Sequence, residues 1–149
     1  ADATAAFNGG TIDAWVVWDP FYAIAQERYN ARIIADTSDK RLASSSYYLS
    51  SRDFADKSPA VLSAALDEIG KLTEWSGQHR EELAKLAAAA TSIDERSWRA
   101  AFARASFTFG EVTSAQVAQQ QQLADTFYEL GIVPKKVTVS DIVWHQPRS

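Results

Sequence analysis

The sequence predicts an α/β fold class, in which a βαβ unit is followed by a mainly helical C-terminal region. Two observations predict it. An apolar run over residues 14–18, a helix start at Asp19-Pro20 and a β-branched run over 31–35 follow one another without a long gap. From Ser58 onward, apolar residues recur every three or four positions behind residues that favour helix starts.

The α/β part begins with residues 1–7, which are predicted to be the end of a helix that Asn8-Gly9-Gly10 terminates. Residues 14–18 and 31–35 are predicted strands, and residues 20–28 are the helix between them. Asp favours the N-cap position and Pro the first helical position, because both deal with amide groups that lack a helical acceptor. A junction of this kind lies at the carboxyl end of a strand, where open α/β sheets bind their ligands.

Residues 37–46 are polar and predict a loop, and residues 47–49 predict a short strand. Ser58-Pro59 then predicts a helix start. The helix that follows carries one apolar stripe at every third or fourth position, formed by Leu62, Leu66, Ile69 and Leu72.

Three further helices are predicted. Residues 81–90 are rich in alanine. Ser92 with Glu95, and Thr113 with Gln116, have the spacing of a capping box, in which two side chains satisfy amides at the start of a helix. Gly131 and Pro134 predict the end of the last helix.

Charge and composition exclude several functions. The net charge is −4 and the basic residues are scattered, which argues against nucleic acid or an anionic membrane as a partner. The absence of cysteine excludes disulfides and thiolate metal sites. His79 and His145 lack the neighbours of a zinc site, and no nucleophile–base pattern or phosphate loop is present. We therefore expect no catalytic residue, no metal and no cofactor, and no signal peptide or membrane span.

Residues 10–22 read Gly-Thr-Ile-Asp-Ala-Trp-Val-Val-Trp-Asp-Pro-Phe-Tyr, and residues 47–55 read Tyr-Tyr-Leu-Ser-Ser-Arg-Asp-Phe-Ala. Together with Ala-Asp-Thr-Phe-Tyr-Glu at 124–129 and Val-Pro-Lys-Lys at 133–136, they resemble the later half of the aliphatic-sulfonate substrate-binding proteins of ABC transporters. The resemblance implies part of a two-lobe periplasmic-binding-protein type II fold. Residues 1–46 would belong to the second α/β lobe, 47–57 to the return crossover or hinge, and 58–149 to helices that pack on the first lobe.

The resemblance also implies a function and partners. The protein would capture an aliphatic sulfonate in the periplasm, or in an extracytoplasmic and membrane-tethered form, and deliver it to an ABC permease without being an enzyme. The alternatives are a binding protein for taurine, nitrate or a thiamine-precursor pyrimidine, or a fold-related desulfinase-type enzyme whose catalytic residues lie outside this chain. Its apolar stripes would pair with the N-terminal half of the same protein or with a second copy, and no nucleic acid would bind.

Four residues are candidate ligand contacts, namely Trp18, Asp19, Ser46 and Arg104. Each has a second interpretation. Trp18 lines the ligand cleft or packs in the core, and Asp19 lines the cleft or only caps its helix. Ser46 offers a hydroxyl to an anion or belongs to a polar loop, and Arg104 binds a sulfonate or pairs with a carboxylate or a helix end. A carboxylate at Asp19 would repel an anion, so it should meet an amino or hydroxyl group or act through water.

Overall fold

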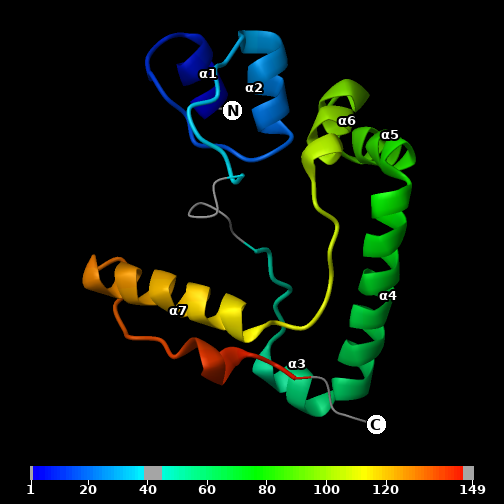
Figure 1. The fold of residues 1–149 in the computed structure, drawn as a ribbon, viewed down its shortest axis with the longest axis vertical. Coiled ribbons are helices and arrows are strands. Elements are labelled where there is room, and N and C mark those ends of the chain that lie inside the picture. Colours follow the sequence, from blue (N-terminus) through cyan, green and yellow to red (C-terminus); the bar gives the residue numbers. More distant parts are fainter. Residues whose placement is uncertain (1, 39–44, 146–149) are drawn as a thin grey trace. The chain divides into compact units, whose positions relative to one another are not determined.

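The computed structural model describes residues 2–38 and 45–145 of the chain (Figure 1). The described residues form seven α-helices and one short 3-10 helix. These are α1 (Asp2–Asn8), α2 (Phe21–Tyr29), α3 (Arg52–Lys57), α4 (Pro59–Gln78), α5 (Arg80–Thr91), α6 (Glu95–Arg104), α7 (Ser114–Glu129) and η1 (Val139–Ile142). None of these helices is both long and apolar enough to cross a membrane.

The predicted strands are not present in the described residues, so the βαβ part of the predicted fold class is wrong for this structure. Residues 14–18, 31–35 and 47–49 form neither strand nor helix. A strand exists only when its amides and carbonyls pair with a neighbouring strand. These three segments leave large apolar side chains in solvent, since Val16, Ile34 and Leu49 are 98%, 76% and 94% exposed. These segments have the composition of buried strands but lack a neighbour within the described residues.

The helix predicted after Ser58 is confirmed. Helix α4 begins at Pro59, and the Ser58 carbonyl accepts hydrogen bonds from the amides of Val61 and Leu62. Residues 60–75 are helical throughout. Proline is suited to this first position because its missing amide hydrogen would have no acceptor there.

Helix α7 also begins and ends as predicted. The Thr113 side chain accepts from the Gln116 amide and the Gln116 side chain accepts from the Thr113 amide, which completes the capping box. The chain leaves the helix through Gly131, whose φ of +70° lies in the left-handed region that favours glycine.

The start of α6 differs from the prediction. Asp94 is its N-cap, and the Asp94 side chain accepts from the Ser97 amide, whereas Ser92 caps the end of α5 with a φ of 58°. The capping box at Ser92 and Glu95 is therefore wrong, because Asp is as good an N-cap as Ser and stands closer to the helix. Helix α3 was not predicted either, since six residues are too few to show a period, although Ser51 caps it.

The described residues separate into two compact units. Unit 1 is described over residues 2–38 and 72–108, and unit 2 over residues 45–71 and 109–145. Helix α4 contributes residues to both. The predicted domain limits at residues 46 and 57 remain a prediction, and residues 39–44 of the predicted loop at 37–46 lie outside the described residues.

The interior of unit 1 is built from small side chains. Helix α6 packs on α2 and on α5. The buried residues at these contacts are alanine or serine, namely Ala23, Ala25, Ala84, Ser97 and Ala101. The helices can approach closely because alanine carries only a methyl group and serine only a hydroxymethyl group. An aromatic cluster then adds apolar area, since Phe102 stacks on Trp98 at 5.1 Å and lies 5.9 Å from Phe107.

Unit 2 is held by fewer buried groups. Ala55 is the one buried hydrophobic residue among its described residues. The Gln121 side chain joins α7 to the segment before η1, since it donates to the Val137 carbonyl at 2.9 Å and accepts from the Val139 amide at 2.8 Å. Tyr48 and Phe109 lie edge to face at 5.9 Å.

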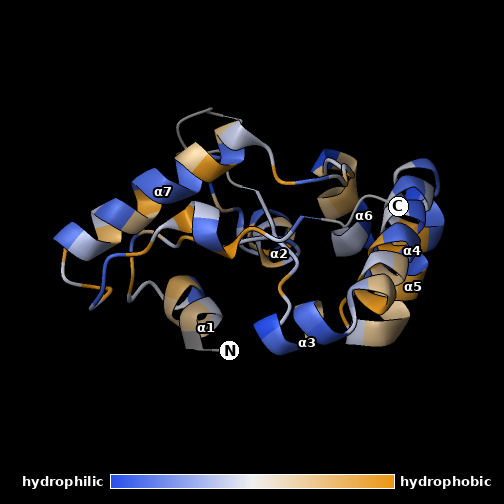
Figure 2. Cartoon of the chain, turned by 90° about the horizontal axis from the view of Figure 1, so that it is seen from below, coloured by the Kyte–Doolittle hydropathy of each residue, from blue (hydrophilic) through white to orange (hydrophobic). Residues whose placement is uncertain are grey.

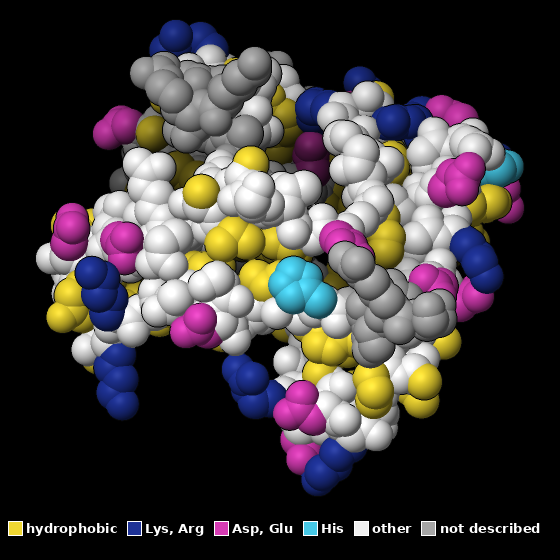
Figure 3. All heavy atoms as spheres, turned by 60° about the horizontal axis from the view of Figure 1, so that its bottom comes forward, with side chains coloured by type: hydrophobic (Ala, Val, Ile, Leu, Met, Phe, Trp, Pro, Cys, Tyr) yellow, Lys and Arg dark blue, Asp and Glu magenta, His cyan; other side chains and the backbone are white. Residues whose placement is uncertain are grey.

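Large apolar side chains remain exposed in both units. Helix α7 has no buried residue, and its apolar residues interrupt the polar surface of the helix in Figure 2. Apolar side chains likewise reach the surface in several places on the face drawn in Figure 3. Val61 and Leu72 of α4 are 60% and 59% exposed, and Leu123 of α7 is 46% exposed. Of the stripe predicted on α4, Leu72 is exposed, whereas Leu62, Leu66 and Ile69 are half-buried.

The N-cap of α6 should make unit 1 sensitive to acid. The Ser97 amide lowers the pKa of Asp94 below its ordinary value of 3.8, with help from the Ser97 hydroxyl and from Arg28 at 2.6 Å. A lowered pKa means that Asp94 stabilises the fold above 3.8, and that this contribution disappears as the pH falls through the lower folded value. We expect Asp94→Ala to cost about 1 kcal/mol at neutral pH and almost nothing at strongly acidic pH. Urea unfolding of both proteins at the two pH values measures this, and an equal cost at both would contradict it.

Candidate functional site

Asp19 lies at the start of α2, as the sequence predicted, but one residue earlier than an N-cap. Helix α2 begins at Phe21 with Pro20 as its N-cap, and Pro20 makes no side-chain cap. The Asp19 Oδ1 atom accepts a hydrogen bond from the Ala23 amide at 3.2 Å. The carboxylate therefore binds an amide of its own helix, as predicted, and its side chain is 30% exposed.

Arg104, the last residue of α6, binds the same carboxylate. Its Nη2 donates to Asp19 Oδ1 at 2.8 Å and its Nε donates to Asp19 Oδ2 at 3.1 Å. Two parallel bonds of this kind are the strongest pairing of guanidinium with carboxylate. The hydrogen bond to Asp19 is also the main reason that the pKa of Arg104 is raised, so the guanidinium stays charged.

Two further residues of α2 contact Arg104. The Gln26 Oε1 atom accepts from Arg104 Nη1 at 3.2 Å, and the Arg104 Cζ atom lies 4.2 Å from the centre of the Tyr22 ring. Sequence reasoning missed both residues. A signal was available, because the sequence predicted a helix start at Asp19, and residues 22 and 26 lie on one side of such a helix, three and seven positions later.

Trp18 is 77% exposed, next to Asp19. Trp15, three residues earlier, is half-buried, and its ring lies 6.0 Å from that of Phe7 in α1. One tryptophan therefore packs within unit 1 while the other offers an apolar ring to solvent. The role of Trp18 in ligand binding remains a prediction.

Ser46 is exposed and belongs to unit 2, whereas the other three candidate residues belong to unit 1. Its neighbour Ser45 accepts a hydrogen bond from the Gln116 side chain at 3.1 Å, which ties this segment to the start of α7. The contribution of Ser46 to a ligand site also remains a prediction.

Two surface hollows lie elsewhere. One, of about 330 Å³, is lined by residues from Ile33 to Ser38 in unit 1. The other, of about 290 Å³, lies in unit 2 between the start of α7 and residues 140–145, and His145 is on its edge. Neither includes a candidate residue. The part of the chain that the structure describes contains no group of three acidic, histidine or cysteine side chains that could hold a metal.

Replacement of Asp19 by alanine should destabilise unit 1. The change removes the bond to the Ala23 amide and leaves Arg104 without its carboxylate. We expect a loss of about 1 kcal/mol, typical of a lost helix-start interaction. Thermal unfolding followed by circular dichroism measures the loss. Asp13→Ala is the matched control, because Asp13 is exposed and precedes the same helix.

Known proteins similar to this chain are binding proteins. No family model matches it. A protein of Escherichia coli named as an aliphatic sulfonates-binding protein is 33% identical over 97% of this chain and 45% of its own length. A Bacillus subtilis protein of the same name is 24% identical over 95% of the chain and 43% of its own length. The chain therefore spans less than half the length of these curated relatives.

Solved structures of two binding proteins are similar in fold to this chain. The periplasmic aliphatic sulphonate-binding protein of Escherichia coli superimposes with a TM-score of 0.87 at 31% identity, over 99% of this chain and 48% of that one. The alkanesulfonate-binding protein of Xanthomonas axonopodis pv. citri bound to MOPS gives a TM-score of 0.85 at 26% identity, over 96% of this chain and 50% of that one. This chain is thus similar in fold to about half of each of these longer chains.

Proposed function

We infer that the chain belongs to the extracytoplasmic solute-binding component of an ABC importer. Nearly the whole chain is similar to aliphatic sulfonate-binding proteins, and it spans about half the length of each of them. Such a component captures an aliphatic sulfonate in the periplasm and delivers it to a permease without covalent chemistry. The observation that carries this proposal is the match to the Escherichia coli structure, with a TM-score of 0.87 over 99% of the chain.

The proposal requires a second polypeptide segment. The chain spans 48% and 50% of the two matching structures. Some apolar residues on α4 and α7 are exposed, among them Leu72 at 59% and Phe127 at 39%. Both facts support a protein in which an N-terminal half covers these helices, or a second copy does so.

The ligand would meet residues of different chemistry. Arg104 supplies a positive charge to the sulfonate, and the exposed ring of Trp18 supplies an apolar surface for the alkyl group. Asp19 is next to Trp18 in the sequence and pairs with Arg104, and Ser46, an exposed residue of unit 2, is a separate candidate for a polar contact. This combination of an apolar wall and a few polar groups is typical of small-molecule sites.

Calorimetry tests the function. The full 149-residue chain would be titrated alone and after pairing with the half of the Escherichia coli relative that it does not match. We expect 1-butanesulfonate to bind the pair more tightly than taurine or nitrate does, and the chain alone to bind none of them. If nitrate binds most tightly, the assignment to sulfonates is wrong, and if taurine does, the chain belongs to a taurine-binding protein. If none binds the pair, the proposed function itself fails.

A further inference from the structure

We propose that Asp19, just before α2, and Tyr22 and Gln26 of α2 form a cradle that fixes the guanidinium of Arg104 and leaves part of it for a sulfonate group. Arg104 would then be the ligand contact, and Asp19 would be a positioning residue that acts through it. The inference rests on the proposed function, because it takes the ligand to be an aliphatic sulfonate. It adds two residues, Tyr22 and Gln26, and it assigns Asp19 a role other than contact with the ligand.

The hydrogen bonds carry the first part of the argument. A guanidinium has five N–H donors in a fixed plane. Asp19 takes two of them, at Nε and Nη2, and Gln26 takes one at Nη1. Within the described part of the chain, two donors remain, one on each terminal nitrogen. A sulfonate presents oxygens that can accept from both.

The ring of Tyr22 restricts the guanidinium of Arg104 from another side. It lies 4.2 Å from the Cζ atom of Arg104, so it covers one face of the guanidinium. A ring on one face and a carboxylate along one edge together restrict rotation of the group. The Arg104 side chain is still 37% exposed. A pre-oriented and accessible donor pair loses little entropy when it binds an anion.

The charges explain why Asp19 should not touch the sulfonate. Its Oδ1 atom already accepts from Ala23 and from Arg104, and its Oδ2 atom accepts from Arg104. A carboxylate in direct contact with a second anion would repel it. The paired guanidinium cancels that repulsion at close range. Orientation by a carboxylate partner is also how many metal-binding histidines are positioned, although no metal is involved here.

The proposal is tested by measuring the affinities of 1-butanesulfonate and of the uncharged butane-1-sulfonamide. Both are measured on the chain paired with the complementary half, which is the half of the Escherichia coli relative that the chain does not match. Arg104→Lys keeps the charge but loses the planar fork, so we expect about tenfold weaker sulfonate binding. Tyr22→Leu leaves every charge in place, and we expect sulfonate binding to weaken about threefold to tenfold while sulfonamide binding stays unchanged. Tyr29→Leu is the matched control, since it makes the same change on the same helix outside the cradle.

A second measurement does not depend on the ligand. In the NMR spectrum of the paired chain, the Arg104 Nε–H should exchange slowly with solvent, and Tyr22→Leu should make its exchange faster. The proposal is overturned if Arg104→Lys binds the sulfonate as well as the parent does. It is also overturned if Tyr22→Leu weakens both ligands equally, or if the Nε–H is unprotected. Failure of the parent protein to bind any sulfonate would instead reject the proposed function, and the inference with it.

Discussion

Sedimentation of the isolated chain is expected to show self-association, and addition of the complementary half should convert the material into a one-to-one pair. The reason is the amount of apolar surface without cover. Exposed side chains include Val61, Leu72, Leu123, Phe127 and Ile142. Burial of a large apolar side chain contributes about 1.5–3 kcal/mol, so several together match the whole net stability of a domain, about 5–15 kcal/mol.

Variants identify the surface that associates. Leu72→Ser should reduce self-association of the isolated chain, because Leu72 is 59% exposed and its loss removes apolar surface from α4. The same change should weaken binding of the complementary half. Lys85→Ser, which alters an exposed polar residue of α5, is the control. A compact monomer that unfolds cooperatively and binds sulfonate by itself would contradict the prediction.

Arg80→Ala is expected to produce the largest loss of stability among single substitutions in unit 1, about 3 kcal/mol. Arg80 begins α5 and donates to carbonyls that two other helices leave without partners. These are the carbonyls of Gly77 at 3.3 Å, Ala105 at 3.1 Å and Phe102. Hydrogen bonds from a charged group contribute about 1.5–3 kcal/mol each when one partner is removed. The guanidinium also lies 5.1 Å from the centre of the Phe107 ring.

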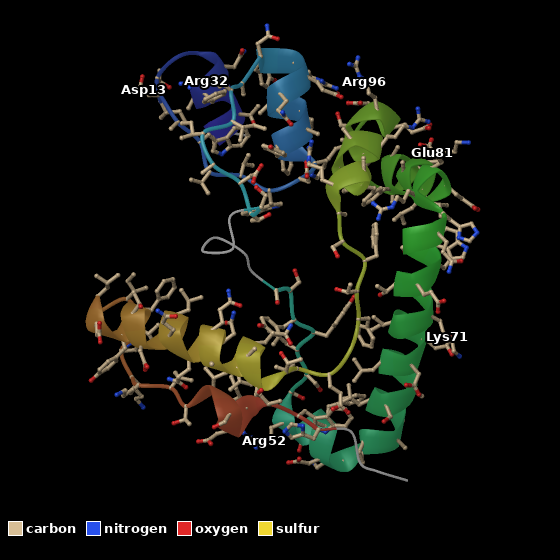
Figure 4. All side chains as sticks on the ribbon, in the orientation of Figure 1. Asp13, Arg32, Arg52, Lys71, Glu81 and Arg96 are labelled. Atoms are coloured by element: carbon tan, nitrogen blue, oxygen red, sulfur yellow. The ribbon has the colours of Figure 1, made fainter. Side chains whose placement is uncertain are left out.

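Denaturant unfolding of the paired chain measures this loss. Arg96→Ala is the matched control, because Arg96 lies on α6 (Figure 4) and forms an ion pair with Glu27 at 3.3 Å. Its side chain is 80% exposed, so the change should cost less than about 1 kcal/mol. Similar losses in the two variants would show that Arg80 does not hold the helix ends together.

The helices could be predicted because their signals are local. The stripe from Leu62 to Leu72 and the capping box at Thr113 depend on residues within a few positions of one another, and α4 and α7 form where those signals lie. Strands depend on partners elsewhere. The run at 31–35 has the right composition, but nothing within it specifies the neighbouring strand that would make it part of a sheet.

The candidate site could be predicted only in part. Asp19 follows from Asp-Pro at a helix start, and the possibility that Arg104 pairs with a carboxylate follows from its chemistry. The identity of that carboxylate does not, because the two residues are 85 positions apart in the sequence. The contribution of Tyr22 and Gln26 could have been found by extending the helical period from the predicted helix start at Asp19.

The exposure of Trp18 makes the candidate ligand site accessible to fluorescence measurements. Of the five tryptophans, Trp18 is exposed, and Trp15, Trp75, Trp98 and Trp144 are half-buried. A collisional quencher such as acrylamide should therefore reach Trp18 first. The quenchable part of the fluorescence then reports the turn that precedes α2, next to the Asp19–Arg104 pair. Occupation of this turn, by a ligand or by another part of the protein, can be followed as shielding of one indole without any added label.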